Sequence, residues 1–254
     1  MANACVQSQY FSGQGAVLLA DRDASGNPTG GFTPVGNVSA LTLGVETTTY
    51  QHKESCSGAR GVDLEIVQEI SVSMSMTMES LSKENLALAL YGTESLVSAG
   101  TVTDEAITAV VDKWVGLNYI NISSVVVTDS TGTTTYTEGT DYEVNAAAGS
   151  IKVLSAGSIA DGDSLLVDYS YTDQDAIEAV TSGTPPIKWV RFEGLNTADT
   201  DKPVVIDLYK VSVQPLAELA LIGDEITQMA VEAKVLSDST KTTGSKYFKI
   251  RKVA

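Results

Sequence analysis

Histidine and cysteine are scarce in this chain of 254 residues, which contains one histidine and two cysteines. Two cysteines do not make the disulfide framework of a small secreted domain. A single histidine leaves little room for histidine-based catalysis or a histidine-rich metal site. Cys5 and Cys56 could pair only if the fold brought them together, so we expect free thiols in a reducing compartment.

Several enzyme motifs are absent as well. The chain has no phosphate-binding loop, no Gly-x-Gly-x-x-Gly, no Cys-x-x-Cys and no Gly-x-Ser-x-Gly. Asp21 and Asp23 begin a partial calcium-loop pattern, but Phe32 stands where a bidentate glutamate is needed, which favours a polar turn. His52 and Cys56 lie in a hydrophilic segment without a catalytic signature. We therefore predict no enzyme activity, no cofactor and no metal site.

Positive charge is also in short supply. The 16 basic residues face 32 acidic ones, which gives a formal net charge of −16 and argues against binding by phosphate neutralisation. No apolar run approaches the roughly 18 residues of a membrane span. The first ten residues lack the basic start and apolar core of a secretory signal. The hydrophobic fraction of 43% predicts a folded chain with a sizeable core.

The most informative segment runs from Val62 to Met78, where apolar and polar residues alternate with little interruption. This period predicts one very long strand with one buried face and one wet face. Ordinary strands have about 5–6 residues, so this strand must bend or project beyond its domain. The methionines on its apolar face are expected in the core.

A short amphipathic helix is predicted directly after this strand. Ser82 is a good N-cap, Gly92 is a natural stop, and the apolar face would contain Leu86, Ala89 and Leu90. The preceding polar segment, residues 46–61, has no apolar periodicity and is expected to form a long loop or an extended arm.

Residues 98–183 have the pattern of a separate module. Short β-favouring runs, including Thr133–Thr137, recur between Gly- and Asp-containing turns, which predicts a small β-sandwich. Strands resume after residue 184, among them Glu225–Leu236. The predicted fold is mainly β, with a β-sandwich or barrel domain formed by residues 1–97 and 184–254, one short helix, and an inserted Ig-like β-sandwich at 98–183.

The chain resembles the major tail tube proteins of long-tailed bacteriophages. Two blocks carry the resemblance. The first runs from Thr47 to Gly92 and ends in the sequence ENLALALYG. The second contains Val190–Asn196, Pro203–Val211 and Leu221–Glu225, followed by the strand to Leu236. The resemblance implies a structural virion protein that forms stacked hexameric rings around a hollow tube, assembled in the bacterial cytoplasm.

The resemblance also implies partners and surfaces. Family members enclose a tape-measure protein, meet terminator and tip proteins, and conduct double-stranded DNA without binding it. If the wet face of the long strand lines the tube, acidic rings would repel DNA phosphates. The expected lumen residues are Asp63, Glu65, Glu69, Ser71, Ser73, Ser75 and Glu79, with Asp207 and Glu225 as weaker candidates from other strands.

Two further contact surfaces are expected. The 46–61 segment would reach the neighbouring ring through Tyr50, His52, Lys53, Glu54 and Arg60. Residues 241–254 hold five basic residues and no acidic ones, and could meet an acidic surface of the next subunit. The residues proposed for this contact are Lys246, Lys249, Arg251 and Lys252.

Two alternatives to tube formation remain open at the level of the sequence. In the first, the chain is a surface-binding module whose Ig-like part recognises a carbohydrate or a receptor. In the second, it is a β-rich hydrolase that uses paired carboxylates, although no local motif marks such a pair.

Overall fold

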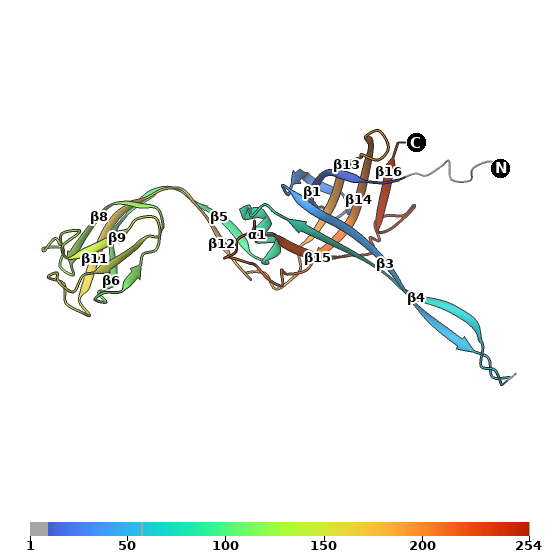
Figure 1. Cartoon of the computed structure of the whole chain (residues 1–254), viewed down its shortest axis with the longest axis horizontal. Coiled ribbons are helices and arrows are strands. Elements are labelled where there is room, and N and C mark those ends of the chain that lie inside the picture. The colour runs from blue at the N-terminus through green and yellow to red at the C-terminus, as the bar shows by residue number, and fades with distance from the viewer. Residues whose placement is uncertain (1–9, 57, 254) are drawn as a thin grey trace. The chain divides into compact units, whose positions relative to one another are not determined.

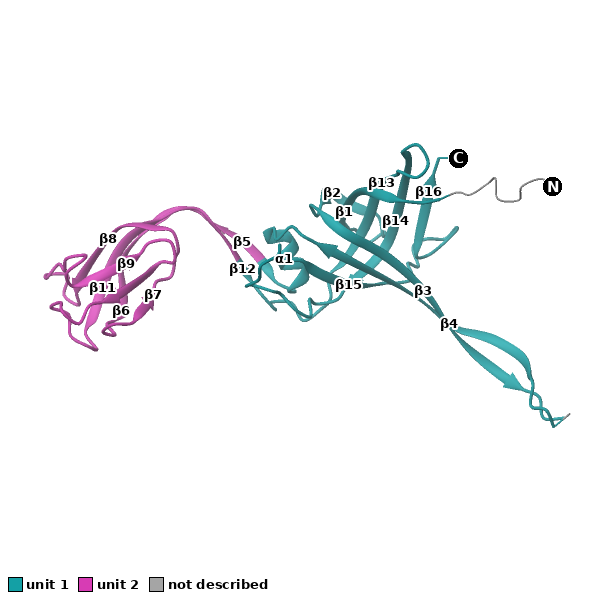
Figure 2. Cartoon of the chain, in the orientation of Figure 1, with its two compact units in different colours: residues 1–93, 177–254 teal, residues 94–176 magenta. Residues whose placement is uncertain are grey.

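The structure, a computed structural model, describes residues 10–56 and 58–253 and is mainly β (Figure 1). The chain divides into two compact units (Figure 2). Unit 1 combines the residues up to Thr93 with those from Ile177 onward, and unit 2 is Glu94–Ala176. Among the described residues, no helix is long and apolar enough to cross a membrane.

Unit 1 contains one large antiparallel sheet and one helix. Its elements are β1 (Gly13–Arg22), β2 (Pro28–Pro34), β3 (Val38–Lys53), β4 (Val62–Met78), α1 (Lys83–Ala89), β13 (Ile187–Asn196), β14 (Lys202–Val213), β15 (Met229–Val235) and β16 (Phe248–Lys252). The strand order is β2-β1-β13-β14-β15-β4-β3, with β16 paired to β14. The predicted strand at Glu225–Leu236 begins only at Met229, so Glu225 lies in a connecting loop.

The sheet divides at β14, and this division produces a sandwich-like body. One edge of β14 pairs with β16 through Val204–Leu208 and with β15 through Val211–Val213. The two parts of the sheet share a single core, formed by side chains of β1, β4, β13, β14, β15 and α1. Met74, Met76, Met78 and Met229 are fully buried there, which confirms that the methionine stripe is core.

Helix α1 follows β4 as expected, with Ser82 as its N-cap accepting the backbone N–H of Asn85. Its buried face agrees with the prediction at Ala89 and at Leu86, which packs against the core, but it also includes Asn85 and Leu88. The amide of Asn85 donates hydrogen bonds to the carbonyls of Val35 and Ser80. These bonds hold the helix face that contains Asn85, Leu88 and Ala89 against the rest of unit 1, so these residues are buried. The left-handed residue at the end is Tyr91, with a φ of 53°.

Gly92 therefore has a different role from the stop residue that the sequence suggested. Its N–H donates to the Ala87 carbonyl and closes the last turn of the helix. A Cβ on Gly92 would lie 2.5 Å from the Glu178 carbonyl oxygen. Only glycine fits at position 92, because the backbone of Glu178 passes too close to leave room for a Cβ. A positive φ is not the reason.

Residues 46–61 form an extended arm, which is one of the two alternatives that the sequence left open, with a turn region after Lys53. Residues 46–53 continue β3, which pairs with β4 almost to its first residue. The outer halves of β3 and β4 lie beyond the core and form a two-stranded arm, defined here as Glu46–Lys53 with Val62–Ile70 (Figure 1). The sequence allowed an arm here but did not show that residues 46–53 are a strand, because threonine-rich β3 lacks the alternation that marks β4.

Unit 2 is a small β-sandwich. Its strands are β6 (Gly100–Thr108), β7 (Trp114–Gly116), β8 (Ile122–Asp129), β9 (Tyr142–Asn145), β10 (Ser150–Val153) and β11 (Ser164–Tyr171). They form two three-stranded sheets, β7-β10-β9 and β6-β11-β8, around one core. The predicted strand Thr133–Thr137 is wrong, since this segment makes only an isolated bridge between Thr128 and Thr135.

The limits of the insert differ from the predicted 98–183. Strands β5 (Thr93–Val97) and β12 (Gln174–Glu178) pair with each other where the chain passes between the units. This pairing moves the boundaries to residues 94 and 176. The sequence placed the exit at the Thr-Pro-Pro segment near residue 184, but long-range strand pairing sets it earlier.

We expect acid to weaken unit 2 through Asp129. Hydrogen bonds from the backbone N–H of Thr133, and from Thr131 and Thr134, lower the pKa of Asp129 to about 2. A carboxyl with a lowered native pKa adds stability above its unfolded pKa of about 3.9, and this is lost as the pH falls toward 2. Asp129→Asn should therefore lose less stability than the parent between pH 4 and pH 2, measured by amide exchange in unit 2. Identical pH dependence would contradict this role.

Candidate functional site

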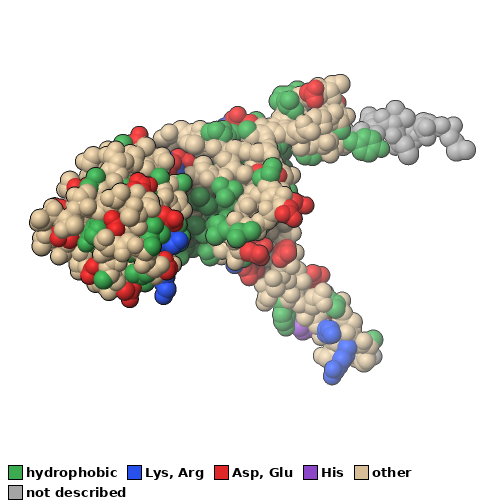
Figure 3. Space-filling view, turned by 60° about the vertical axis from the view of Figure 1, so that its left-hand side comes forward, with side chains coloured by type: hydrophobic (Ala, Val, Ile, Leu, Met, Phe, Trp, Pro, Cys, Tyr) green, Lys and Arg blue, Asp and Glu red, His purple; other side chains and the backbone are tan. Residues whose placement is uncertain are grey.

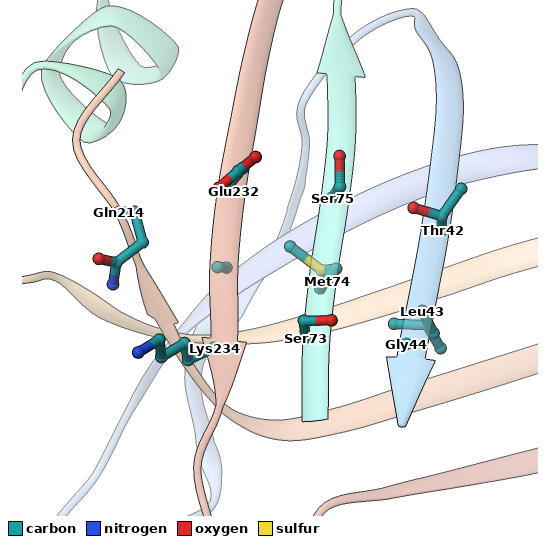
Figure 4. Close-up of a pocket in the computed structure, with 10 residues that line it drawn as sticks. Thr42, Leu43, Gly44, Ser73, Met74, Ser75, Gln214, Glu232 and Lys234 are labelled. Carbon is teal, nitrogen blue, oxygen red and sulfur yellow. The ribbon is translucent and has the colours of Figure 1, made fainter. Parts of the chain in front are cut away.

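The wet face of the sheet carries small polar side chains where β3, β4 and β15 lie side by side. Register places them in two cross-strand rows, Gly44–Ser73–Lys234 and Thr42–Ser75–Glu232. With Gln214 these residues line a cavity of about 370 Å³ (Figure 4). Glu232 and Lys234 provide one charge of each sign, so this part of the wet face is nearly neutral and rich in hydroxyl groups.

A bulge in β4 separates the expected lumen residues. Thr48 and Thr49 of β3 oppose Glu69 and Val67, so Gln68 has no partner residue. An extra residue in one strand inverts the side-chain alternation beyond it. The strict alternation that the sequence indicated is therefore broken in the middle of the strand.

The inversion moves Glu65 to the other face. Alternate residues of β3 lie on the same face of the sheet. Positions 47, 49 and 51 of β3 share one face, and their partners on β4 are Ile70, Val67 and Glu65, respectively. Glu65 thus continues the face of Ile70, whereas Ile66 turns to the face of Glu69. The prediction that Glu65 and Glu69 share one wet face is wrong. Glu69, Ser71, Ser73 and Ser75 remain together, because no bulge lies between them.

Asp63 is separated from the others by a second bulge. His52 opposes Leu64 and Lys53 opposes Val62, which leaves Asp63 unopposed in the ladder. Its carboxylate lies 2.6 Å from Nδ1 of His52, near the end of the arm. The structure therefore groups Asp63 with the arm residues and not with the serines of the sheet.

The other acidic candidates occupy different places. Glu79 accepts hydrogen bonds from the side chains of Asn37 and Gln228 at the end of β4. Asp207 is buried and forms ion pairs with Arg191 and Arg251, so it is not an exposed lumen charge. Sequence reasoning predicted neither ion pair, because each arginine lies on another strand and only the sheet brings them to β14.

The arm carries the residues that were expected to reach a neighbour. Tyr50, His52 and Lys53 lie on β3 and are exposed. Glu54 and Arg60 belong to the turn region, where the Glu54 N–H donates to the Gly61 carbonyl. The five residues therefore share one end of unit 1.

Apolar side chains on both faces of the arm are the feature that the sequence analysis missed. Ile70 and Val67 are 48% and 55% exposed on one face, and Tyr50 and Ile66 are each 50% exposed on the other. Isolated two-stranded hairpins are marginally stable in water. The signal that could have revealed this surface is the length of the apolar alternation, which far exceeds what one domain can cover.

The basic C-terminal residues are only partly available for contacts. Arg251 binds Asp207 within the chain, and Lys249 opposes Asp207 in the ladder between β14 and β16. Lys246 is exposed next to β16, while Lys252 opposes Val204. The expectation that Arg251 acts mainly between subunits is therefore not supported, because its carboxylate partner lies on the neighbouring strand.

The described residues offer no arrangement for a bound metal, as they contain no group of three or more His, Cys, Asp or Glu side chains close enough to share one. Asp23 closes the turn between β1 and β2, accepting the Asn27 N–H through its side chain. Asp21 pairs with Lys188. The partial calcium pattern is thus a turn, as predicted. Cys56 is an exposed free thiol, and Cys5 lies outside the described residues.

Residues 10–251 match a protein family described as "Protein of unknown function UCP028589". Because the match spans nearly the whole chain, the chain belongs to this family. A search among curated proteins found no match.

Proposed function

We propose that this protein is a structural subunit that assembles with copies of itself into a hollow tube of stacked rings, like the major tail tube proteins of long-tailed bacteriophages. The proposal rests on the resemblance over Thr47–Gly92 and over the strands from Val190 onward. The observation that carries it is the arm, whose two faces both expose apolar side chains.

The arm needs a protein partner on each face. An apolar side chain that leaves water gains about 25 cal/mol per Å², and two strands alone have nothing with which to bury these residues. A second copy of the chain is the partner because the sheet also ends in strands with one open edge. Strands β2, β3 and β16 each pair on one side only within the described residues. Unpaired edges are natural sites for adding another strand.

The geometry of such contacts favours an open assembly. The arm lies at one end of unit 1, whereas the body of the sheet offers a different surface to receive it (Figure 1). Contacts between two different surfaces of identical chains are heterologous and produce rings or filaments. Hexameric rings, the tape-measure protein, and the terminator and tip proteins are part of this proposal through the resemblance, as is a place in the virion.

The wet face around Ser73 and Ser75 would form the channel wall. Its hydroxyl groups and the opposite charges of Glu232 and Lys234 provide no concentrated positive charge for phosphates. The net charge of −16 adds a repulsive field, so DNA would pass without being held. Of the acidic residues expected on this wall, Glu69 lies on the same face as these serines, and Glu79 follows them at the end of β4.

Sedimentation velocity tests the proposal in solution. The purified chain, studied over a hundredfold range of concentration at moderate salt, should convert from a 26.7 kDa monomer to large, rapidly sedimenting species. If the contact is heterologous, the assemblies should keep increasing in size as the protein concentration rises. A species that stops at a dimer would favour a closed interface and contradict tube formation.

A further inference from the structure

One tryptophan of unit 2 lies on the surface of the sandwich. Trp114 on β7 is 51% exposed, whereas Trp189, the other tryptophan of the chain, is buried in unit 1. Tryptophan combines a large apolar face with one polar N–H, and for this reason it is enriched at binding interfaces. The indole is therefore a candidate contact surface.

The side chains around Trp114 form a small polar platform. Along β7, β10 and β9, alternate residues such as Val115, Ile151 and Val144 turn toward the core. The residues between them face outward, and the register places them in two rows, Trp114–Lys152–Glu143 and Gly116–Ser150–Asn145. The outer face of this sheet thus combines one flat aromatic ring with hydrogen-bonding groups.

The space beside the indole is open. A Cβ built on Gly116 would have no atom of the other described residues of unit 2 within 4 Å, apart from its chain neighbours, so the position is open within that unit. The Lys152 ammonium lies 6.0 Å from the centre of the Trp114 ring and 3.4 Å from a Glu143 carboxylate oxygen. Asn145 uses its side-chain oxygen to accept the Ala148 N–H, which leaves its amide group able to donate outward.

The acidic net charge of unit 2 favours a neutral ligand over an anionic one. Residues 94–176 contain 13 acidic residues and two basic ones, Lys113 and Lys152. One of these precedes Trp114 in the chain and the other lies beside its ring. Acidic side chains are spread over the rest of the unit (Figure 3). A polyanion would be repelled by this field, whereas the mixed donors and acceptors of the platform suit hydroxyl groups, which both donate and accept.

We propose that this face binds a neutral polysaccharide. The apolar face of a pyranose ring stacks on Trp114, and its hydroxyl groups exchange hydrogen bonds with Lys152, Glu143, Ser150 and Asn145. The platform is open beside the indole at Gly116, which leaves room for a sugar ring there. An exposed site of this kind is weak by itself and gains avidity when many copies are displayed together.

The test uses the full chain, fluorescently labelled, on a microarray of neutral and anionic polysaccharides. Binding to at least one neutral polysaccharide is expected, with apparent affinity reduced about tenfold or more by Trp114→Ala, because the variant removes the apolar surface on which the sugar ring stacks. Trp114→Phe should retain part of the binding. Val126→Ala is the matched control, because Val126 is exposed on the other sheet, and it should bind like the parent.

Three results would overturn this inference: no binding to any neutral polysaccharide, binding only to anionic ones, or binding that persists unchanged in Trp114→Ala. Each can be distinguished from a failure of the proposed tube, because the array measures unit 2 in assembled and unassembled chains alike. Thermal unfolding of the variants shows that lost binding does not come from lost folding.

Discussion

Replacing Ile66 by serine is expected to abolish assembly while leaving the folded chain intact. Ile66 lies on the arm opposite Tyr50, half exposed and outside the core of unit 1. In an assembled tube its side chain would be covered by another copy, and each subunit would lose that buried surface. Even about 1.4 kcal/mol lost per contact lowers an association constant tenfold, and the loss is repeated at every contact along a filament. The critical concentration for assembly, measured by pelleting, should rise at least tenfold.

Val126→Ser provides the control for this experiment. Val126 is also exposed and apolar, but it belongs to β8 in unit 2 and is not part of the arm. This variant should assemble at the parent's concentration. If Ile66→Ser assembled equally well, the arm would not be the main contact and another surface of unit 1 would have to replace it.

The largest effect on stability is expected from Met76→Ala. Met76 is fully buried in the inner half of β4, opposite Leu41 on one neighbouring strand and Val231 on the other. Removing most of this side chain loses its transfer free energy and leaves a cavity, which together cost about 2–5 kcal/mol. Denaturant unfolding followed by the buried Trp189 should show a lower midpoint without a change in slope.

Ser75→Ala is the control for Met76→Ala, because Ser75 is the neighbouring residue of the same strand. It shows whether a loss of stability comes from core packing or from any change in this part of β4. Ser75 points to the wet face, so its replacement should change stability by no more than about 0.5 kcal/mol. A loss as large as that of Met76→Ala would mean that the two faces of β4 are assigned the wrong way round.

The sequence predicted the features that local patterns determine. Strand β4 begins and ends where the alternation does, and Ser82 caps the helix. Both follow from side-chain periodicity and from hydrogen bonds between neighbouring residues. The buried methionines follow from the same alternation because β4 has a neighbour on each side over its inner half.

What the sequence could not predict depends on pairing between distant strands. The bulge at Gln68 exists only relative to β3, and it moves Glu65 away from the face of Glu69. Asp207 has an ordinary strand sequence around it, and its ion pairs with Arg191 and Arg251 arise from two other strands. A period of two in one strand cannot show where its partner skips a residue.

The residues on the wet face differ from those that the sequence predicted for the wall of the proposed channel. The sequence suggested rings of four acidic side chains, whereas the structure keeps Glu69 with the serines, places Glu79 after them at the end of β4, and adds Glu232 and Lys234 from β15. A wall of hydroxyl groups with few charges, most of them acidic, binds phosphate weakly. In a tube, smooth passage of DNA would then depend on the absence of positive clusters more than on acidic rings.

Negative-stain electron microscopy of the purified, concentrated chain tests the central claim most directly. The tube proposal predicts rings with a central hole, or hollow tubes, and predicts that they disappear in Ile66→Ser and persist in Val126→Ser. Solid fibrils, or dispersed single particles at concentrations where the parent chain remains folded, would contradict it.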